Sequence, residues 1–340
     1  KASGEPSCTK REKRAASEEP NADLSSKKLR ASEDEMETSE TSLVTEEPVR
    51  IHESLDPAAA VNAWQDWVQT KNAELERSSL SGKRQLKLFK TNLLGMTPEE
   101  LNYALCLFIK EVRQHDGTAP SPCRIYLQCL GIQQYLHEQG RQDNIFADPQ
   151  YEMFTGCFHN IFCQAHDPSR DSQEHIREEV LWQARQLGDH SPVVLLNTLM
   201  YFNVKYFRLH TVDQHLQLTL ADVTEEEQED SKGQPMKILR STAACQEQQS
   251  EPTCFDQPQN LDNPHRCPVK LYQLYLSKCP DTVKSQQGTY YMLPDRTCNT
   301  EAAVWYSRSP LGKDTISRML TRFSVVEEVK DISSKLICPA

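Results

Sequence analysis

Two histidines and an aspartate stand close together in the stretch RLHTVDQHLQL: His210, Asp213 and His215. Imidazole and carboxylate groups are the side chains that general acid–base catalysis of hydrolysis uses. A hydrolytic site also needs a nucleophile or a phosphate-binding loop, and no serine, cysteine or glycine-rich loop accompanies these residues. We therefore favour structural roles for them, on a short surface helix that begins at Thr211.

A second group of residues has metal-ligand chemistry. His159, Cys163 and His166 recur at spacings of four and three residues, which places them on one helical face with Cys157 nearby. The alternative to a zinc site is that the thiols are packed and the histidines lie at the helix end, where their charge suits the helix dipole. We favour this alternative and predict neither a metal nor a cofactor.

The composition limits the class of protein. The 340 residues carry a formal net charge of −11, which argues against a chain that coats nucleic acid without specificity. The twelve scattered cysteines, several inside apolar helical patterns, are typical of buried thiols in a reducing compartment. No apolar run approaches the roughly eighteen residues that span a bilayer, so we expect no membrane partner. The chain starts without a methionine, and we interpret it as the C-terminal part of a longer protein.

Residues 1–55 are rich in Ser, Glu, Lys and Pro and have no periodic apolar pattern, so we predict a disordered tail. Its two basic clusters are typical of a bipartite nuclear-import signal, and the alternative is a solvated charge run. The clusters consist of Lys10, Arg11, Lys13, Arg14, Lys27, Lys28 and Arg30. The acidic Ser/Thr tract at 32–47 is expected to be a phosphorylation region.

The elements of a folded chain begin at residue 56. Residues 56–166 contain four segments of helical apolar period, each opened by a capping residue followed by proline or, in one case, by proline and a capping box. The capping residues are Asp56, Thr97, Ser121 and Asp148. This pattern predicts a small all-helical domain.

Residues 172–335 predict an α+β domain. Helices are expected at 174–188, 191–207, 267–278 and 314–329, and strands at 215–223, 235–241, 289–294 and 303–307. The helix at 191–207 is apolar nearly all round and is therefore expected in the centre of the domain. The stretch 224–263 is too polar for a core and predicts a hairpin followed by a long loop.

Several stretches in this order resemble the C-terminal domain shared by the zinc finger MYM-type proteins and the glutamine-rich protein related to them. They are NLLGMTPEELNYALCLFIKEVR, LGIQQYLHEQGRQDNIFADP, SPVVLLNTLMYFNVKYF, RCPVKLYQLYLSKCP and AVWYSRSPLGKDTISRML, and they cover roughly 92–329. That domain is similar to the tyrosine recombinases of Crypton transposons. The resemblance implies a mainly α fold with a smaller α+β part, in which a helical core-binding-like domain precedes a tyrosine-recombinase-like mixed α/β domain.

The resemblance also supplies a test of activity. Tyrosine recombinases cleave DNA with a tyrosine and stabilise the phosphate with two arginines and with histidine or lysine groups. Their first arginine ends a Gly-Leu-Arg turn, where this chain reads Arg208-Leu209-His210, and a mostly neutral histidine lacks the guanidinium's bidentate fork. Lys232 could match the hairpin lysine, and a solvated loop lysine is the alternative. After Ser307 there is neither histidine nor tyrosine, so we predict no catalysis.

The resemblance therefore predicts a non-catalytic interaction module of a nuclear chromatin or transcription regulator. It implies corepressor and histone-modifying assemblies as partners, and no small-molecule substrate. The alternative from another class is DNA binding without cleavage, and a degenerate recombinase that acts as a dimer is a third hypothesis. Candidate DNA contacts, diluted by acidic neighbours, are Lys83, Arg84, Lys87, Lys90, Lys313, Arg318 and Arg322.

Overall fold

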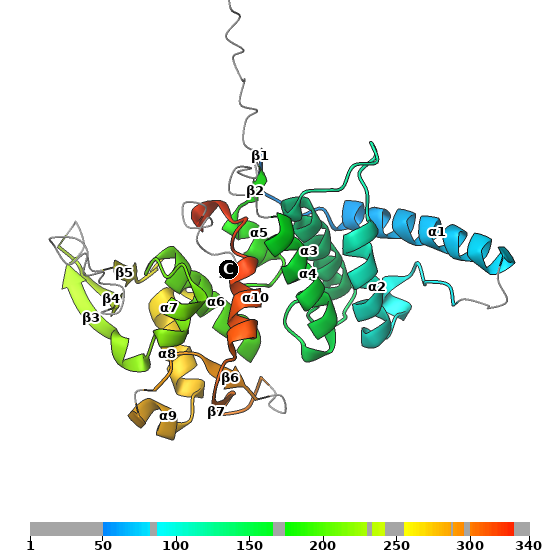
Figure 1. The fold of residues 1–340 in the computed structure, drawn as a ribbon. Coiled ribbons are helices and arrows are strands. Elements are labelled where there is room, and N and C mark those ends of the chain that lie inside the picture. The colour runs from blue at the N-terminus through cyan, green and yellow to red at the C-terminus, as the bar shows by residue number, and fades with distance from the viewer. Residues whose placement is uncertain are drawn as a thin grey trace, which may run out of the picture. The chain divides into compact units, whose positions relative to one another are not determined.

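The computed structural model describes residues 50–81, 87–165, 174–229, 233–241, 255–286, 288–295 and 300–329, and all of them belong to one compact unit (Figure 1). The predicted mainly helical fold, with a smaller part that mixes helices and strands, is confirmed. Within these ranges no helix combines the length and the apolar character that crossing a membrane requires. The seven residues of the predicted import signal lie outside them.

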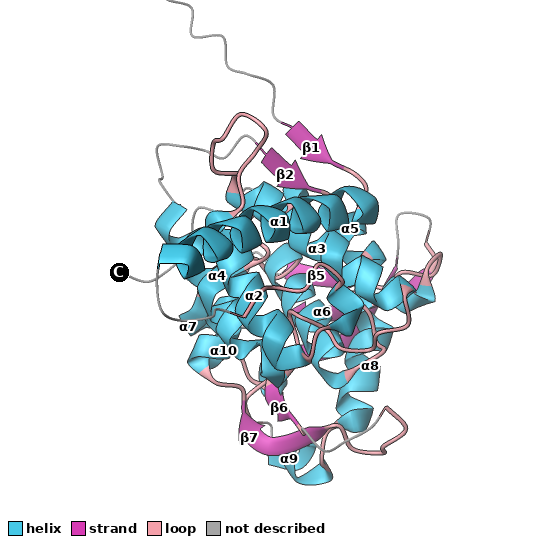
Figure 2. Cartoon of the chain, turned by 90° about the vertical axis from the view of Figure 1, so that its right-hand side faces the viewer, coloured by secondary structure: helices cyan, strands magenta, loops and turns pink. Residues whose placement is uncertain are grey.

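The first part of the fold is helical (Figure 2). Its elements are α1 (Pro57–Ser81), the 3-10 turn η1 (Leu93–Gly95), α2 (Pro98–Glu111), α3 (Pro122–Glu138), the 3-10 turn η2 (Pro149–Tyr151) and α4 (Glu152–Ala165). Helices α1 and α3 pack closely because Gly131 has no side chain. A Cβ added there would lie 2.6 Å from the Cβ of Ala60, so a larger residue would push the two helices apart.

Three of the four predicted helix starts have the expected caps. The Asp56 carboxylate accepts from the Ala59 amide at 2.9 Å. Thr97 forms a capping box with Glu100, and the Ser121 hydroxyl accepts an amide hydrogen bond in the first turn of α3. Asp148 differs, because its carboxylate bonds a preceding loop amide and the segment begins as the 3-10 turn η2.

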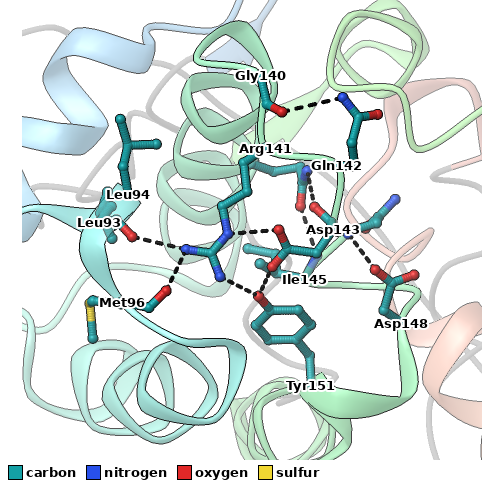
Figure 3. Close-up of polar contacts among 12 residues, drawn as sticks. Leu93, Leu94, Met96, Gly140, Arg141, Gln142, Asp143, Ile145, Asp148 and Tyr151 are labelled. Carbon is teal, nitrogen blue, oxygen red and sulfur yellow. Dashed lines mark hydrogen bonds and ion pairs between the residues drawn. The ribbon is translucent and has the colours of Figure 1, made fainter.

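Arg141 joins the loop before α2 to the loop after α3 (Figure 3). Its guanidinium donates to the carbonyl oxygens of Leu93 and Met96 at 3.0 and 2.9 Å, to Asp143 at 2.6 Å and to the Tyr151 hydroxyl at 3.2 Å. Tyr151 in turn donates to Asp143. Burial opposes ionisation of Asp143, but the bonds from Arg141 and Tyr151 hold its pKa below the usual value. The cluster fixes the start of α4.

The second part mixes helices and strands. Its helices are α5 (Glu178–Gln183), α6 (Pro192–Lys205), α7 (Val212–Gln217), α8 (Pro268–Lys278), α9 (Asp281–Gln286) and α10 (Lys313–Thr321), with 3-10 turns η3 (Leu220–Asp222), η4 (Pro264–Arg266) and η5 (Glu327–Val329). Strands β3 (Val223–Glu229), β4 (Pro235–Ser241) and β5 (Phe255–Pro258) form an antiparallel sheet in that order, and β6 (Met292–Pro294) pairs with β7 (Tyr306–Pro310).

Helix α6 is the centre of this part, as its sequence predicts. Every residue from Val194 to Val204 is buried. Figures 1 and 2 show α8 and α10 on opposite sides of α6. Because α6 is packed on all sides, its position is fixed. The C-terminal end of α6 therefore determines where the residues after Lys205 lie.

One predicted strand of this part was wrong. The stretch 215–223 was expected as a strand, but Thr211 caps a helix that includes its first residues, and the strand β3 starts only at Val223. Alternation of apolar residues fits either structure, and the capping box at Thr211 decides for the helix. The acidic β3 is stabilised across the ladder, since Glu225 and Glu226 pair with Lys237 and Arg240 of β4.

Two short strands that pair in parallel were not predicted either. Strand β1 (Arg50–His52) lies within the predicted disordered tail, and β2 (Glu174–Ile176) within the predicted helix at 174–188. The two strands pair in parallel, and the Ile176 amide also donates to the Val325 carbonyl at 2.9 Å. Pairing between segments so distant in sequence leaves no local pattern in either of them.

Candidate functional site

The turn after α6 occupies the position at which the resemblance places a phosphate-binding arginine. Arg208 is exposed and has φ +57°, in the left-handed region that favours glycine. Leu209 is buried, and its amide donates to the Asn203 carbonyl at 3.3 Å. The His210 amide donates to the Gln214 side chain at 2.7 Å, which ties the turn to the start of α7.

A chain of buried hydrogen bonds runs beneath this turn. Gln257 Nε2 donates to Asn203 Oδ1 at 2.7 Å, and Asn203 Nδ2 donates to the Tyr291 hydroxyl at 2.7 Å. The Tyr291 oxygen lies 2.7 Å from His215 Nδ1, and His215 Nε2 lies 3.2 Å from the Leu209 carbonyl oxygen. A carbonyl can only accept, so Nε2 carries the proton and Nδ1 accepts from Tyr291. Every bond in the chain therefore has one donor and one acceptor.

This network is electrically neutral at physiological pH. Burial lowers the pKa of His215 to about 4, against a weaker opposing effect of its bond to the Leu209 carbonyl. Burial also raises the pKa of Tyr291 far above its usual value. The neutral imidazole suits the hydrogen-bond directions, because a second proton on Nδ1 would confront the hydroxyl proton of Tyr291. The position beneath the turn thus stabilises the fold and supplies no charge to a phosphate.

The hydrolytic arrangement suggested by spacing is not assembled. His215 is fully buried and faces Tyr291, whereas Asp213 is exposed and lies 3.5 Å from Lys313 Nζ. The expectation that these residues share a surface helix is therefore wrong for His215. A signal was present in the sequence: His215 stands three residues from both Val212 and Leu218, on the buried side of α7.

Arg322 follows α10 and is buried instead of facing solvent. It is 6% exposed, and its guanidinium donates to the Phe146 carbonyl at 2.7 Å and to Asn197 Oδ1 at 3.1 Å. The cation also lies 5.7 Å from the centre of the Phe146 ring. These contacts join the helical part to α6, and they leave the guanidinium with no surface to offer to a phosphate. Helical spacing alone could not reveal this, because the partners lie 125 and 176 residues away.

The other predicted DNA contacts that the structure describes are paired with carboxylates. Lys87 and Lys90 both bind Glu100, at 2.7 and 2.6 Å, and these bonds lower the pKa of Glu100 to about 2. Arg318 lies 3.3 Å from Glu152. Lys83, Arg84 and Lys232 lie outside the described residues.

Residues of the considered zinc site act as a link between helices. His159 Nδ1 lies 2.7 Å from Thr321 Oγ1 in α10, and the Thr321 hydroxyl already donates to the Ser317 carbonyl, so the imidazole Nδ1 is the donor. Cys163 Sγ lies 3.5 Å from His159 Nε2, but this sulfur is in a disulfide and has no proton to donate. Burial lowers the pKa of His159. Among the described residues no three His, Cys, Asp or Glu side chains are placed to hold a metal, and His166 is outside that set.

Comparisons with known proteins divide the chain into two matched regions. Residues 54–164 match the family model described as the QRICH1 domain, and residues 173–325 match the Domain of unknown function (DUF3504). The domain boundaries expected at 166 and 172 stay a prediction, since that segment is outside the described residues.

Three named relatives each match about four-fifths of the chain. Transcriptional regulator QRICH1 of Homo sapiens is 37% identical over 301 residues, which are 82% of this chain and 38% of the relative. Zinc finger MYM-type protein 2 of Mus musculus is 37% identical over 293 residues, 80% of this chain and 21% of the relative. Zinc finger MYM-type protein 3 of Mus musculus is 35% identical over 296 residues, 81% of this chain and 22% of the relative. The chain thus spans less than half the length of these relatives. No solved structure matches it, so the recombinase-like fold stays a prediction.

Proposed function

Because the chain belongs to the family that contains transcriptional regulator QRICH1 and the zinc finger MYM-type proteins, we propose that it is a non-catalytic, recombinase-derived interaction module of a nuclear transcription regulator. The names of these relatives support a role in transcriptional regulation. The proposed partners are protein assemblies of the corepressor and histone-modifying class, and the proposed location is the nucleus.

One observation carries the non-catalytic part of the proposal: the turn after α6 has a histidine where the resemblance expects an arginine, and His215 beneath the turn is neutral. Phosphoryl transfer needs fixed positive charge around the phosphate. His215 is neutral and buried, Lys313 is paired with the Asp213 carboxylate, and Arg322 is directed into the core. The arginine of this turn, Arg208, is exposed and has a left-handed backbone conformation, two positions before the one at which the resemblance expects an arginine.

The same pairing disfavours the DNA-binding alternative. Release of counterions drives binding to duplex DNA only where lysine and arginine side chains are available to phosphates. Lys87 and Lys90 share Glu100, and Arg318 lies against Glu152, so a phosphate would have to displace a carboxylate at each place. We therefore favour protein partners for the folded part of the chain.

Affinity capture with a nuclease arm tests this choice. Tagged residues 1–340 and a control of residues 1–49 alone would be expressed in cultured cells and recovered from nuclear extract with and without nuclease treatment. We expect transcription-regulatory proteins on the 1–340 chain only, with amounts that nuclease leaves unchanged. Their loss after nuclease treatment would mean that DNA mediates the contacts, and the protein-binding proposal would fall.

Direct measurements complete the test. Fluorescence anisotropy of the chain with a labelled duplex at low salt should show no salt-sensitive binding, whereas an affinity that falls steeply with salt would establish the DNA-binding alternative. Incubation with a nicked duplex should yield no covalent protein–DNA adduct, since a trapped adduct would contradict the non-catalytic assignment.

The proposed import signal is tested separately. Replacing the basic residues in 10–14 and 27–30 by alanine should abolish nuclear accumulation of a fluorescent fusion of residues 1–340, and unchanged accumulation would refute the signal. A fusion with only the lysines of 27–30 replaced should also lose nuclear accumulation, because a bipartite signal needs both clusters.

A further inference from the structure

Two cysteines on neighbouring helices of the helical part lie in register with each other. The Phe154 amide, in the first turn of α4, donates to Asn102 Oδ1 of α2 at 2.8 Å, which aligns the two helices near their starts. About one turn later on each helix come Cys106, four residues after Asn102, and Cys157, three residues after Phe154. The helices therefore run side by side in the same direction, with the two thiols on facing sides.

The two thiols differ in their exposure to solvent, so an oxidant from solvent would react with one before the other. Both are free, and the Cys106 thiol lies near enough to that of Cys157 for the two to interact. Cys106 is 4% exposed, whereas Cys157 is partly exposed. Burial raises the pKa of Cys106 to about 12, and contact with Cys157 adds to this effect. A solvent-borne oxidant would thus reach Cys157 first.

We propose that Cys106 and Cys157 are a peroxide-sensitive pair that forms a disulfide between α2 and α4. In the first step the sulfur of Cys157 attacks hydrogen peroxide, the O–O bond breaks, and Cys157 sulfenic acid and one water are formed. In the second step the sulfur of Cys106 attacks the sulfenic sulfur, and the S–O bond breaks. The hydroxide leaves with the thiol proton as a second water, so two thiols are oxidised while one peroxide is reduced.

The link would act at a defined place on the molecular surface. Tyr103 of α2 and Met153 of α4 are 53% and 44% exposed, and each precedes its helix's cysteine by about one turn. A covalent bond between the two helices would fix the spacing of these exposed apolar side chains. Oxidation would then change the mobility of this surface without any change in its composition.

Thiol mapping of the intact chain tests the proposal. Reduced protein would be treated with a small excess of hydrogen peroxide, blocked with N-ethylmaleimide, digested without reductant and analysed by mass spectrometry. We expect a peptide pair that joins Cys106 to Cys157. The proposal is wrong if Cys157 passes to sulfinic acid without a link, if it links to another cysteine, or if both thiols remain alkylated.

Single variants separate the two roles. Cys106→Ser should leave Cys157 as a sulfenic acid that dimedone traps, and Cys157→Ser should abolish the link and give no dimedone adduct at Cys106. Cys129→Ala, which removes a fully buried thiol of α3, is the matched control and should leave the link unchanged. Circular dichroism of each variant would verify folding. Equal dimedone labelling of wild type and Cys106→Ser would overturn the assignment of Cys106 as the resolving thiol.

Discussion

Acidification should destabilise this protein through His215. In the folded state its imidazole is held neutral by burial between Leu209 and Tyr291, and its pKa falls from 6.5 to about 4. The unfolded chain therefore binds a proton at His215 below pH about 6.5 that the folded chain does not bind until pH about 4. The stabilisation is complete above the unfolded pKa and is lost as pH falls towards the folded one.

The magnitude follows from the two pKa values. At pH about 5 the difference in proton binding lowers the free energy of unfolding by about 2 kcal/mol, and the full gap from 6.5 to about 4 corresponds to about 3 kcal/mol. The side chain is 0% exposed, so solvent screening requires no reduction of this figure.

Urea unfolding at pH about 7.5 and about 5 measures the effect. His215→Gln lowers stability at both pH values, but it should lose about 2 kcal/mol less than the wild type on acidification. His265→Gln is the matched control, because that side chain is 89% exposed, and its pH response should follow the wild type. If the His215→Gln variant loses as much stability on acidification as the wild type, the neutral hydrogen-bond chain assigned beneath the turn does not exist.

Three substitutions test other parts of the structure by urea unfolding at neutral pH. Arg208→Gly should raise the free energy of unfolding by about 0.5–1 kcal/mol, because φ +57° strains a residue with a Cβ; a loss of stability would contradict that strain. Arg322→Met should lower it by about 2–4 kcal/mol, since two buried acceptors lose their donor, whereas Arg318→Met should change it by less than about 1 kcal/mol; equal effects would refute the distinction between them. Thr97→Ala should cost about 1 kcal/mol through the lost capping box, and a neutral result would show that the cap is dispensable.

Local signals predicted the helices of this protein better than its strands. Asp56, Thr97 and Ser121 each cap a helix from within three residues, and the uniformly apolar pattern of α6 identified the central helix. The strands β1 and β2 were missed because their pairing joins residues more than a hundred positions apart. Strand β3 contains mostly acidic residues, and it is held by cross-strand ion pairs that only the register reveals.

Contacts between residues far apart in the sequence were also missed at the candidate site. The sequence identified the turn at Arg208-Leu209-His210 and its lack of an arginine at the third position. It did not reveal that His215 completes a buried chain through Tyr291, because the two residues are 76 positions apart and come from different elements. The histidine and aspartate residues at this turn suggested a catalytic role. Because His215 is buried and hydrogen-bonded to Tyr291, its role is to stabilise the fold.

Arg322 makes the two matched regions structurally dependent on each other. It lies in the region that matches DUF3504, yet one of its hydrogen bonds ends on Phe146, in the region that matches the QRICH1 domain. A chain with only the region that matches the QRICH1 domain would leave the Phe146 carbonyl without its donor. A chain with only the region that matches DUF3504 would expose the Arg322 cation, which is now buried. Each region therefore depends on the other for a buried hydrogen bond, and separating the two would lower the stability of both.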